Sequence, residues 1–251
     1  MLLTKELKKY VKSLHQIKFR QKYNKFIAEG PKICFEFMHS GKFEIDHIIC
    51  TEVLLRENEQ LISRFTGKTI ICNDKELKSI SGLVNPNKIL MVLGQSHYNS
   101  SEIDLDKAWG IYCDRIQDPG NMGTILRIAD WFDFPLVLSS ADSVDFYNPK
   151  VIQSAMGAHN RVGFREMSPE SLIQDHSSSS YVLALGGQDM NTVQFPKGGL
   201  IVVGNESRGV RDEILNNTEH HISIKKYGGA ESLNASIACG IASNHIRSLL
   251  D

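Results

Sequence analysis

The sequence predicts an α/β protein of two domains, and three observations support this class. Short apolar segments alternate with stretches of helical periodicity along most of the 251 residues. Several apolar segments, such as 199–203, are continuous, which is typical of strands in a parallel sheet that is covered on both faces. A polar stretch without periodicity at 95–101 separates two such regions. We therefore expect a smaller domain over residues 1–95 and a larger one over 106–251.

The first domain begins with a basic amphipathic helix. Leu3, Leu7, Val11 and Leu14 recur at helical spacing, and lysines lie mostly between them. Residues 1–25 hold eight Lys or Arg residues against the single acid Glu6, a net charge of +7 in a chain whose total is −1. On charge alone, such a segment fits equally a surface that binds a polyanion and an ordinary solvated helix face.

Short strands and helices alternate through the rest of the first domain. A strand at 26–30 leads into a helix over 31–39, where Pro31 suits the first turn and Gly41 ends the helix. The other strands expected here are 46–50, 68–72 and 88–93, and the other helices are 51–65 and 74–81. Asp74 is the expected cap of the last of these helices.

The second domain repeats this alternation. The expected strands are 109–113, 135–139, 181–185, 199–203 and 221–224, and the expected helices are 121–133, 148–157, 168–175, 210–216 and 231–249. Ligands of open parallel sheets bind beyond the carboxyl ends of the strands. The loops after these strands are therefore the expected place for chemistry.

Three of these loops carry unusual residues. The first, 118–123, is a glycine-containing turn before a helix that carries Arg127, and such turns can hold anions on backbone N–H groups. The second, 204–209, contains Glu206. The third, 224–236, contains Ser232 as the expected cap of the last helix and Asn234, whose amide is left for a ligand. Taken singly, Arg127 also fits a surface ion pair, and Glu206 also fits a turn.

Taken in order, the three loops resemble the motifs of the SpoU/TrmH family of RNA ribose 2′-O-methyltransferases in the SPOUT superfamily. The matching residues are Asn121, Gly123 and Arg127, then Gly204, Glu206 and Gly209, then Ile224, Ser232, Leu233 and Asn234. The segment 26–30 with its following helix resembles the family's substrate-binding domain, a ribosomal-protein-like RNA-binding module. One departure is the pair Lys225-Lys226, which replaces the usual Pro-Met and puts two positive charges near a sulfonium.

The resemblance implies a trefoil knot in the C-terminal domain, a homodimer through that domain, and S-adenosylmethionine as cofactor. The cofactor site it implies is formed mostly by backbone atoms, at Ala184, Gly204, Ile224 and Leu233. The catalytic set it implies is Arg127, Asn121, Glu206, Ser232 and Asn234. We expect Arg127 to stabilise the charge that develops on the ribose oxygen, since a guanidinium is a poor general base. Asn121 would orient Arg127 or the ribose.

The remaining features of the sequence argue against a metal site and against a membrane protein. No metal site is expected, because no cysteine pair has zinc spacing and His220-His221 would face opposite sides of a strand. No apolar run reaches the ~20 residues that span a bilayer, so we expect a soluble cytoplasmic protein without a membrane partner. The expected partner is RNA, ribosomal rather than transfer RNA. The alternatives are a transfer RNA 2′-O-methyltransferase, a non-catalytic RNA-binding protein, and a SPOUT enzyme that methylates a base.

Overall fold

A computed structural model describes residues 3–96 and 103–250. The chain groups into two compact units: residues 1–96 with 147–160, and residues 97–146 with 161–251. The stretch 147–160, which the sequence places in the second domain, therefore groups with the N-terminal residues. The predicted linker 95–101 falls mostly on residues outside the described part of the chain. No helix in the described part is both long and apolar enough to cross a membrane.

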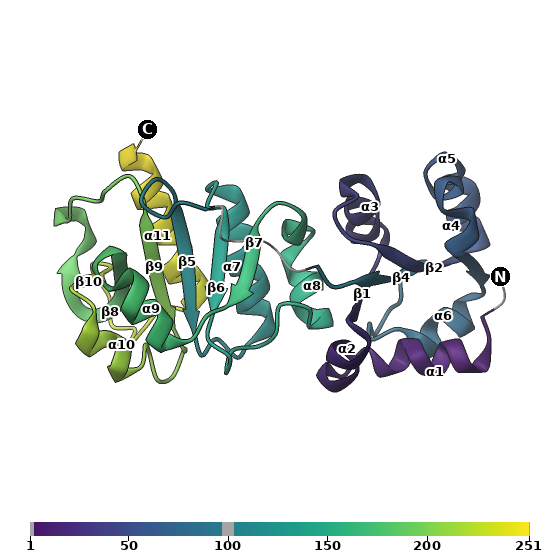
Figure 1. The fold of residues 1–251 in the computed structure, drawn as a ribbon, viewed down its shortest axis with the longest axis horizontal. Helices are drawn as coiled ribbons and strands as arrows, with labels where there is room; N and C mark the ends of the chain where they lie inside the picture. The colour runs from purple at the N-terminus through teal and green to yellow at the C-terminus, as the bar shows by residue number, and fades with distance from the viewer. Residues whose placement is uncertain (1–2, 97–102, 251) are drawn as a thin grey trace. The chain divides into compact units, whose positions relative to one another are not determined.

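The N-terminal unit is a four-stranded sheet flanked by helices (Figure 1). Its strands are β1 (Lys25–Glu29), β2 (Ile45–Thr51), β3 (Thr69–Cys72) and β4 (Ile89–Gly94), in the order β1-β4-β2-β3. Its helices are α1 (Lys5–Ser13), α2 (Ile17–Tyr23), α3 (Pro31–Ser40), α4 (Glu52–Glu57), α5 (Glu59–Ile62), α6 (Asp74–Ile80) and α8 (Pro149–Ala155). β4 runs antiparallel to both of its neighbours, and β3 is parallel to β2.

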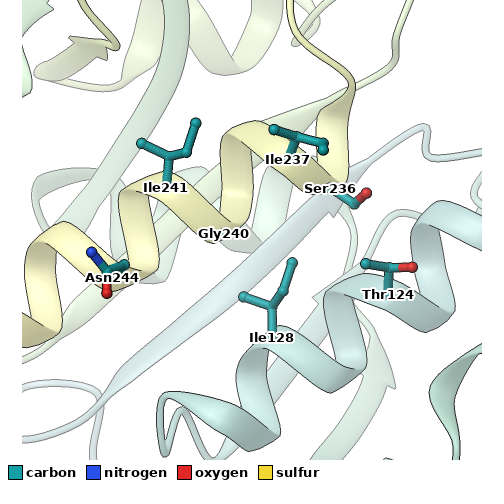
Figure 2. Close-up of a pocket in the computed structure, with 7 residues that line it drawn as sticks. All are labelled: Thr124, Ile128, Ser236, Ile237, Gly240, Ile241 and Asn244. Carbon is teal, nitrogen blue, oxygen red and sulfur yellow. The ribbon is translucent and has the colours of Figure 1, made fainter.

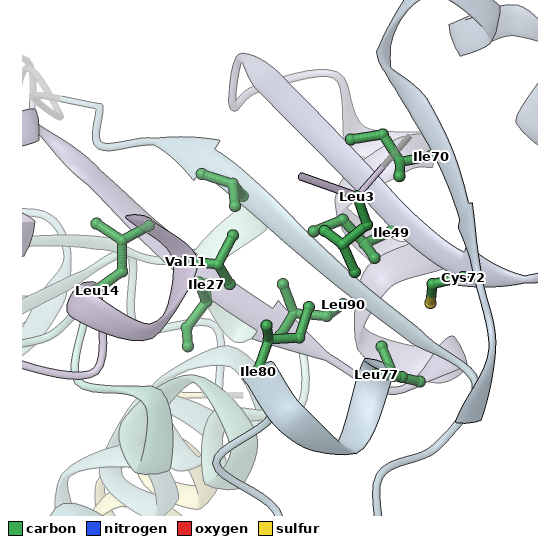
Figure 3. Packing of buried hydrophobic residues seen from close by; sticks show 11 residues of the cluster. Leu3, Val11, Leu14, Ile27, Ile49, Ile70, Cys72, Leu77, Ile80 and Leu90 are labelled. Atoms are coloured by element: carbon green, nitrogen blue, oxygen red, sulfur yellow. The ribbon is translucent and has the colours of Figure 1, made fainter. Parts of the chain in front are cut away.

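The predicted apolar face of the first helix lies in the core of this unit. Leu3, Val11 and Leu14 pack with strand residues such as Ile49 and with Leu77 of α6 (Figure 3). The basic segment is two helices rather than one, because the chain turns between α1 and α2. The predicted helix 51–65 is likewise broken into α4, α5 and a short 3₁₀ helix, Ser63–Lys68.

The predicted cap of α6 is one residue too late. Asn73, not Asp74, accepts the backbone N–H of Glu76, while the Glu76 carboxylate accepts the backbone N–H of Asn73. This reciprocal pair satisfies two backbone N–H donors at the helix start, so Asn73 is the N-cap residue of α6.

The C-terminal unit confirms the predicted parallel α/β sheet. Its strands are β5 (Trp109–Asp114), β6 (Leu136–Ser139), β7 (Gly163–Glu166), β8 (Ser180–Asp189), β9 (Gly199–Gly204) and β10 (His220–Ser223). Its helices are α7 (Pro119–Trp131), α9 (Pro169–His176), α10 (Asp212–Asn217) and α11 (Ala235–Leu250). The strands are parallel throughout, in the order β10-β8-β9-β5-β6-β7.

Helices cover both faces of this sheet (Figure 1). On one face, Tyr112, Leu138 and Val202 pack with Leu172 of α9 and Ile214 of α10. The pair α7 and α11 covers the opposite face. Because all six strands are parallel, the loops after β5, β9 and β10 leave from one edge. That edge is where the three motif loops lie.

Candidate active site

Asn121 is placed by the first motif loop. β5 ends at the buried Asp114, and Asp118 then caps α7 by accepting the backbone N–H of Asn121 at 2.8 Å. Pro119 follows the cap in the first turn, where its missing N–H costs nothing. The helix therefore begins two residues earlier than expected, and Asn121 stands in its first turn with its side chain largely buried.

The side chain of Asn121 joins all three motif loops. Its Nδ2 donates to Glu206 Oε1 in the second loop. Its Oδ1 accepts from Asn234 Nδ2 in the third loop, over 3.0 Å. Ser236 Oγ lies 3.2 Å from Asn121 Oδ1 and 2.7 Å from Asn234 Oδ1, and can donate its one proton to either. We call these four residues the amide network.

Three of the five predicted catalytic residues therefore meet in the amide network, while two lie outside it. Arg127 is exposed on α7, and its side chain makes no hydrogen bond or ion pair with any residue that the structure describes. Ser232 is exposed and likewise makes none within the described residues. Ser236 was not singled out from the sequence, although it lies only two residues after Asn234.

The third loop corrects the expected start of the last helix. α11 begins at Ala235 rather than near 231. Asn234, not Ser232, caps it, because Asn234 Oδ1 accepts the backbone N–H groups of Ser236 and Ile237 at 2.9 and 3.3 Å. The Asn234 amide nitrogen is also not free for a ligand, since it donates to Asn121. Asn234 thus holds the helix start and the network together.

The second loop is a closed turn that presents Glu206. Asn205 and Gly209 form a small antiparallel bridge, and Asn205 Oδ1 accepts the backbone N–H groups of Ser207 and Arg208. A Cβ at Gly204 would lie 2.2 Å from the Val210 backbone nitrogen. Gly204 is therefore required by the close approach of its own loop.

A buried ion pair anchors the second loop to β5. Asp114 has no exposed side-chain surface and accepts from Arg211 twice, from Nε at 2.6 Å and from the backbone N–H at 2.8 Å. Arg211 also donates to Asp142 at 2.9 Å. Burial raises the pKa of Asp142, but hydrogen bonds from Ser140 and Arg211 outweigh it and hold that pKa below its usual value.

Arg115 makes a second link between the first and second loops. Its backbone carbonyl accepts from Asn205 Nδ2 at 3.0 Å, and its guanidinium donates to the Gly209 carbonyl at 3.3 Å. Its φ of 58° turns the chain sharply at the end of β5. Sequence reasoning missed Asp114, Arg115 and Arg211. The one local signal was a charged pair placed directly after a continuous apolar strand.

Two of the four predicted cofactor residues lie on neighbouring strands, Ala184 on β8 and Gly204 on β9, and the other two follow β10. β8 and β10 lose register between Val182 and Gln188, so residues 183–187, which include Ala184, bulge out of the ladder. Gly204 ends β9, and Ile224 directly follows β10. Leu233 lies in the third loop and is 46% exposed.

These residues fit S-adenosylmethionine by the chemistry that they offer. A hollow of about 380 Å³ lies beside the bulge, within the roughly 300–1,000 Å³ of ordinary ligand pockets. Ala184 lines this hollow, together with Glu219, His220 and His221 among others. Ala184, Ile224 and Leu233 have apolar side chains and carry backbone polar groups, which suit an apolar purine face and its polar edge. Lys225 and Lys226 are both exposed, so water and salt weaken the repulsion expected between their charges and a sulfonium.

Comparison with known proteins points to one family. The model of the SpoU rRNA Methylase family matches residues 109–244, and the model of the MRM3-like substrate binding domain matches residues 6–91. The 23S rRNA (guanosine(2553)-2′-O)-methyltransferase RlmP of Bacillus subtilis is 27% identical over 94% of this chain and 94% of its own length.

Solved structures show the same architecture. A putative RNA methyltransferase of the TrmH family from Porphyromonas gingivalis superposes with a TM-score of 0.84 and 26% identity, over 99% of this chain and all of its own. An AdoMet-bound rRNA methyltransferase from Sinorhizobium meliloti has a TM-score of 0.88 at 24% identity, over 99% of this chain and 97% of its own. At that identity, the second match concerns the fold.

Proposed function

The chain belongs to the SpoU rRNA methylase family, as its three motifs predict, and from that premise we propose that it transfers a methyl group from S-adenosylmethionine to a ribose 2′-hydroxyl of ribosomal RNA. The observation that carries the proposal is the amide network, which ties together the three loops that would surround the cofactor and the ribose. A protein that only binds RNA has no need of such a network at the carboxyl edge of the sheet.

The relatives support the substrate. RlmP of Bacillus subtilis is named for 2′-O-methylation of a guanosine in 23S rRNA, and the match covers nearly all of both chains. The domain model matched at 6–91 is a substrate-binding one. We propose that residues 1–95 bind RNA and that residues 106–251 carry out methyl transfer. Ribosomal RNA is favoured over transfer RNA by these names, and the expected compartment is the cytoplasm.

The cofactor would be held at Ala184, Gly204, Ile224 and Leu233. S-adenosylmethionine, when bound, supplies a methyl group on a positively charged sulfur. The protein has to align the ribose hydroxyl with that methyl group and stabilise the negative charge that grows on the oxygen. As the oxygen takes the methyl group, the hydroxyl proton leaves to water or to a phosphate of the RNA.

Arg127 is the side chain we assign to charge stabilisation. It keeps its charge throughout the reaction, so it acts by attraction and hydrogen bonding rather than by taking the proton. The amide network acts on position: Glu206 and Asn234 hold Asn121, and Asn121 fixes the loop that faces the ribose. Ser232, exposed at the third loop, would contact the RNA.

The place of Arg127 supports a homodimer. Arg127 lies six positions after Asn121, so the two side chains leave α7 at different angles and different heights. A groove of about 460 Å³ runs between α7 and α11, lined by Thr124, Ile128, Ser236, Ile237, Gly240, Ile241 and Asn244 (Figure 2). Ile237, which lines the groove, is 55% exposed, and Trp131 at the end of α7 is 83% exposed. We propose that a second copy covers this face and that each Arg127 serves the partner's network.

The knot also remains a proposal. Its support is the order of the sheet, in which the last strand β10 pairs with β8 at one edge and α11 then returns to pack on α7. We propose that the segment after β10 passes through the chain loop that precedes it.

Methyl transfer from labelled S-adenosylmethionine to total bacterial RNA tests the function. We expect label in 2′-O-methylnucleosides after digestion, and ribosomal RNA as the labelled fraction. Label in transfer RNA would favour the transfer RNA alternative, and label in a base would favour a base-modifying SPOUT enzyme. Absence of both transfer and cofactor binding, measured by calorimetry, would leave the non-catalytic RNA-binding protein.

A further inference from the structure

The second helix of the N-terminal unit carries two parallel rows of side chains. Phe19 and Tyr23 are four residues apart, so they lie on one face of α2. Lys18 and Lys22 are also four residues apart and form the adjacent row. Arg20 also belongs to α2, but its side chain points inward and is almost completely buried. The helix therefore presents an aromatic row and a cationic row side by side.

The rings of the aromatic row are held in place by contacts with other rings. Phe19 and Tyr23 are stacked, with centroids 6.2 Å apart and planes 14° from parallel. Tyr10 of α1 meets Tyr23 edge-on at 5.1 Å and 80°. Burial, then the nearby Asp46, raises the pKa of Tyr10 to about 12, and a hydrogen bond from the Tyr10 hydroxyl to that carboxylate contributes to the rise. Tyr23 is thus braced from two sides while 39% of its surface stays exposed.

The lysines around this surface lack acidic partners. Within the described residues, Lys9, Lys12, Lys18 and Lys22 are exposed and form no ion pair. Their neighbours Lys8 and Lys25 are paired, with Glu76 and with Glu44 and Asp46 respectively. Lys22 Nζ instead lies 5.4 Å from the centre of the Tyr23 ring. Asp46, a carboxylate near the cluster, lies 3.9 Å from Lys25 Nζ and 3.1 Å from His47 Nδ1.

We propose that the α2 surface, Phe19 and Tyr23 with Lys18 and Lys22, is a binding site for single-stranded RNA, in which an unpaired base stacks on Tyr23 and the lysines contact the flanking phosphates. The site deepens the proposed function, because it names a feature of the substrate: a single-stranded stretch. Bases within a duplex are covered by their neighbours, so an exposed ring can stack only on a base that is splayed out. Stacking on aromatic rings beside a cationic groove is the general mode of single-strand binding.

Fluorescence anisotropy with a labelled single-stranded RNA, without cofactor, tests the site on the full chain. Tyr23→Ala should weaken binding about tenfold, and Tyr23→Phe should bind nearly as tightly as the wild type, because stacking needs the ring and not the hydroxyl. A duplex of the same sequence should not respond to Tyr23→Ala. Equal affinity of Tyr23→Ala and wild type for the single strand would overturn the proposal.

The lysine row has a matched control. Lys18→Ala with Lys22→Ala should reduce the slope of log affinity against log salt by roughly 1.4, the value for two phosphate contacts on a single strand. Lys42→Ala with Arg64→Ala removes the same charge from exposed positions of the same unit and should leave the slope nearly unchanged. Equal changes in both pairs would mean that net charge alone attracts RNA, which would overturn the site.

Photocrosslinking of the wild type removes the risk that a variant misfolds. RNA that contains 4-thiouridine should crosslink to a peptide with residues 17–24, and crosslinks confined to other peptides would contradict the proposal. The two proposals fail separately. A Tyr23 effect without any methyl transfer would overturn the proposed function alone, whereas methyl transfer with unchanged RNA affinity and KM in Tyr23→Ala would overturn the α2 site alone.

Discussion

Asn234 Nδ2 donates a hydrogen bond to Asn121 Oδ1 over 3.0 Å and so joins two residues that are 113 positions apart. Because Asn121 also donates to Glu206, a single amide couples the first, second and third loops. Asn234 in turn caps α11, so the start of that helix is positioned by the same contacts. The geometry of the site therefore depends on one largely buried side chain.

Loss of this amide should remove turnover while sparing cofactor binding. Asn121→Ala removes the hydrogen bonds that place Glu206 and Asn234, and misplacement by about 1 Å can cost on the order of a hundredfold in rate. We expect kcat to fall by about that factor and the Kd of S-adenosylmethionine to change little, since other residues hold the cofactor. Single-turnover methyl transfer and calorimetry check this. A fall in cofactor affinity as large as the fall in kcat would instead place Asn121 in the cofactor site.

Ser236 should have a smaller effect of the same kind. Ser236→Ala removes one hydrogen bond from the network, worth about 0.5–1.5 kcal/mol, which corresponds to roughly a two- to tenfold lower kcat. Ser243→Ala is the matched control, because Ser243 is also buried on α11 but lies two turns further from the network. Equal losses in the two variants would mean that both act only through helix packing.

Loss of the Asp114–Arg211 ion pair, which anchors the second loop, should lower the free energy of unfolding. Asp114→Ala leaves Arg211 without its buried partner, and breaking such a pair costs about 3 kcal/mol, the lower end for buried pairs because Arg211 is partly exposed. Urea unfolding of the wild type and the variant measures this. Arg208→Ala, in the same loop with an exposed side chain, should change the free energy of unfolding very little. Similar losses in both would contradict the anchoring role.

Stability should depend on pH through His176. Burial, the largest cause, lowers the pKa of His176 below its ordinary value of about 6.5. The unfolded chain therefore binds the proton more tightly, and this contribution to stability is present above pH 6.5 and is lost as pH falls from there towards the folded pKa.

The His176→Gln variant isolates that contribution. The free energy of unfolding of the wild type should fall more than that of the variant between pH 8 and pH 5, by chemical denaturation at each pH. His39→Gln, at an exposed position, should track the wild type. Parallel pH profiles for wild type and His176→Gln would show that burial of this imidazole does not matter.

Most of the fold can be predicted from the sequence, because the apolar residues that helices and strands bury recur at regular spacing or in short runs. Five of the six strands of the C-terminal unit were expected from the sequence, mostly because they are short apolar runs, although β8 extends four residues beyond its expected end at 185. β7 was missed, because Gly163-Phe164-Arg165-Glu166 has no such pattern and pairs only at the edge next to β6. The split between α1 and α2 was also missed, since the lysines continue across it without a glycine or proline.

Some residues of the candidate site could likewise be predicted from the sequence, and others could not. The motif residues could be named from their order along the chain, and Asn121, Glu206 and Asn234 do meet. The pair Asp114–Arg211 could not, because a contact across 97 positions leaves no periodic signal in either segment. The cap of α11 was misassigned because Ser232 and Asn234 are both good capping residues. Only the hydrogen bonds of Asn234 decide between them.

The most direct test of the account is a heterodimer of two inactive chains. Arg127→Ala keeps the amide network, Asn121→Ala keeps Arg127, and copurification through two different tags yields the mixed dimer. If each Arg127 serves the partner's network, one of the two sites is intact, and methyl transfer to ribose should return to about half of the wild-type rate while each variant alone stays inactive. A mixed dimer as inactive as its parents would contradict a site assembled from the network of one chain and the arginine of the other.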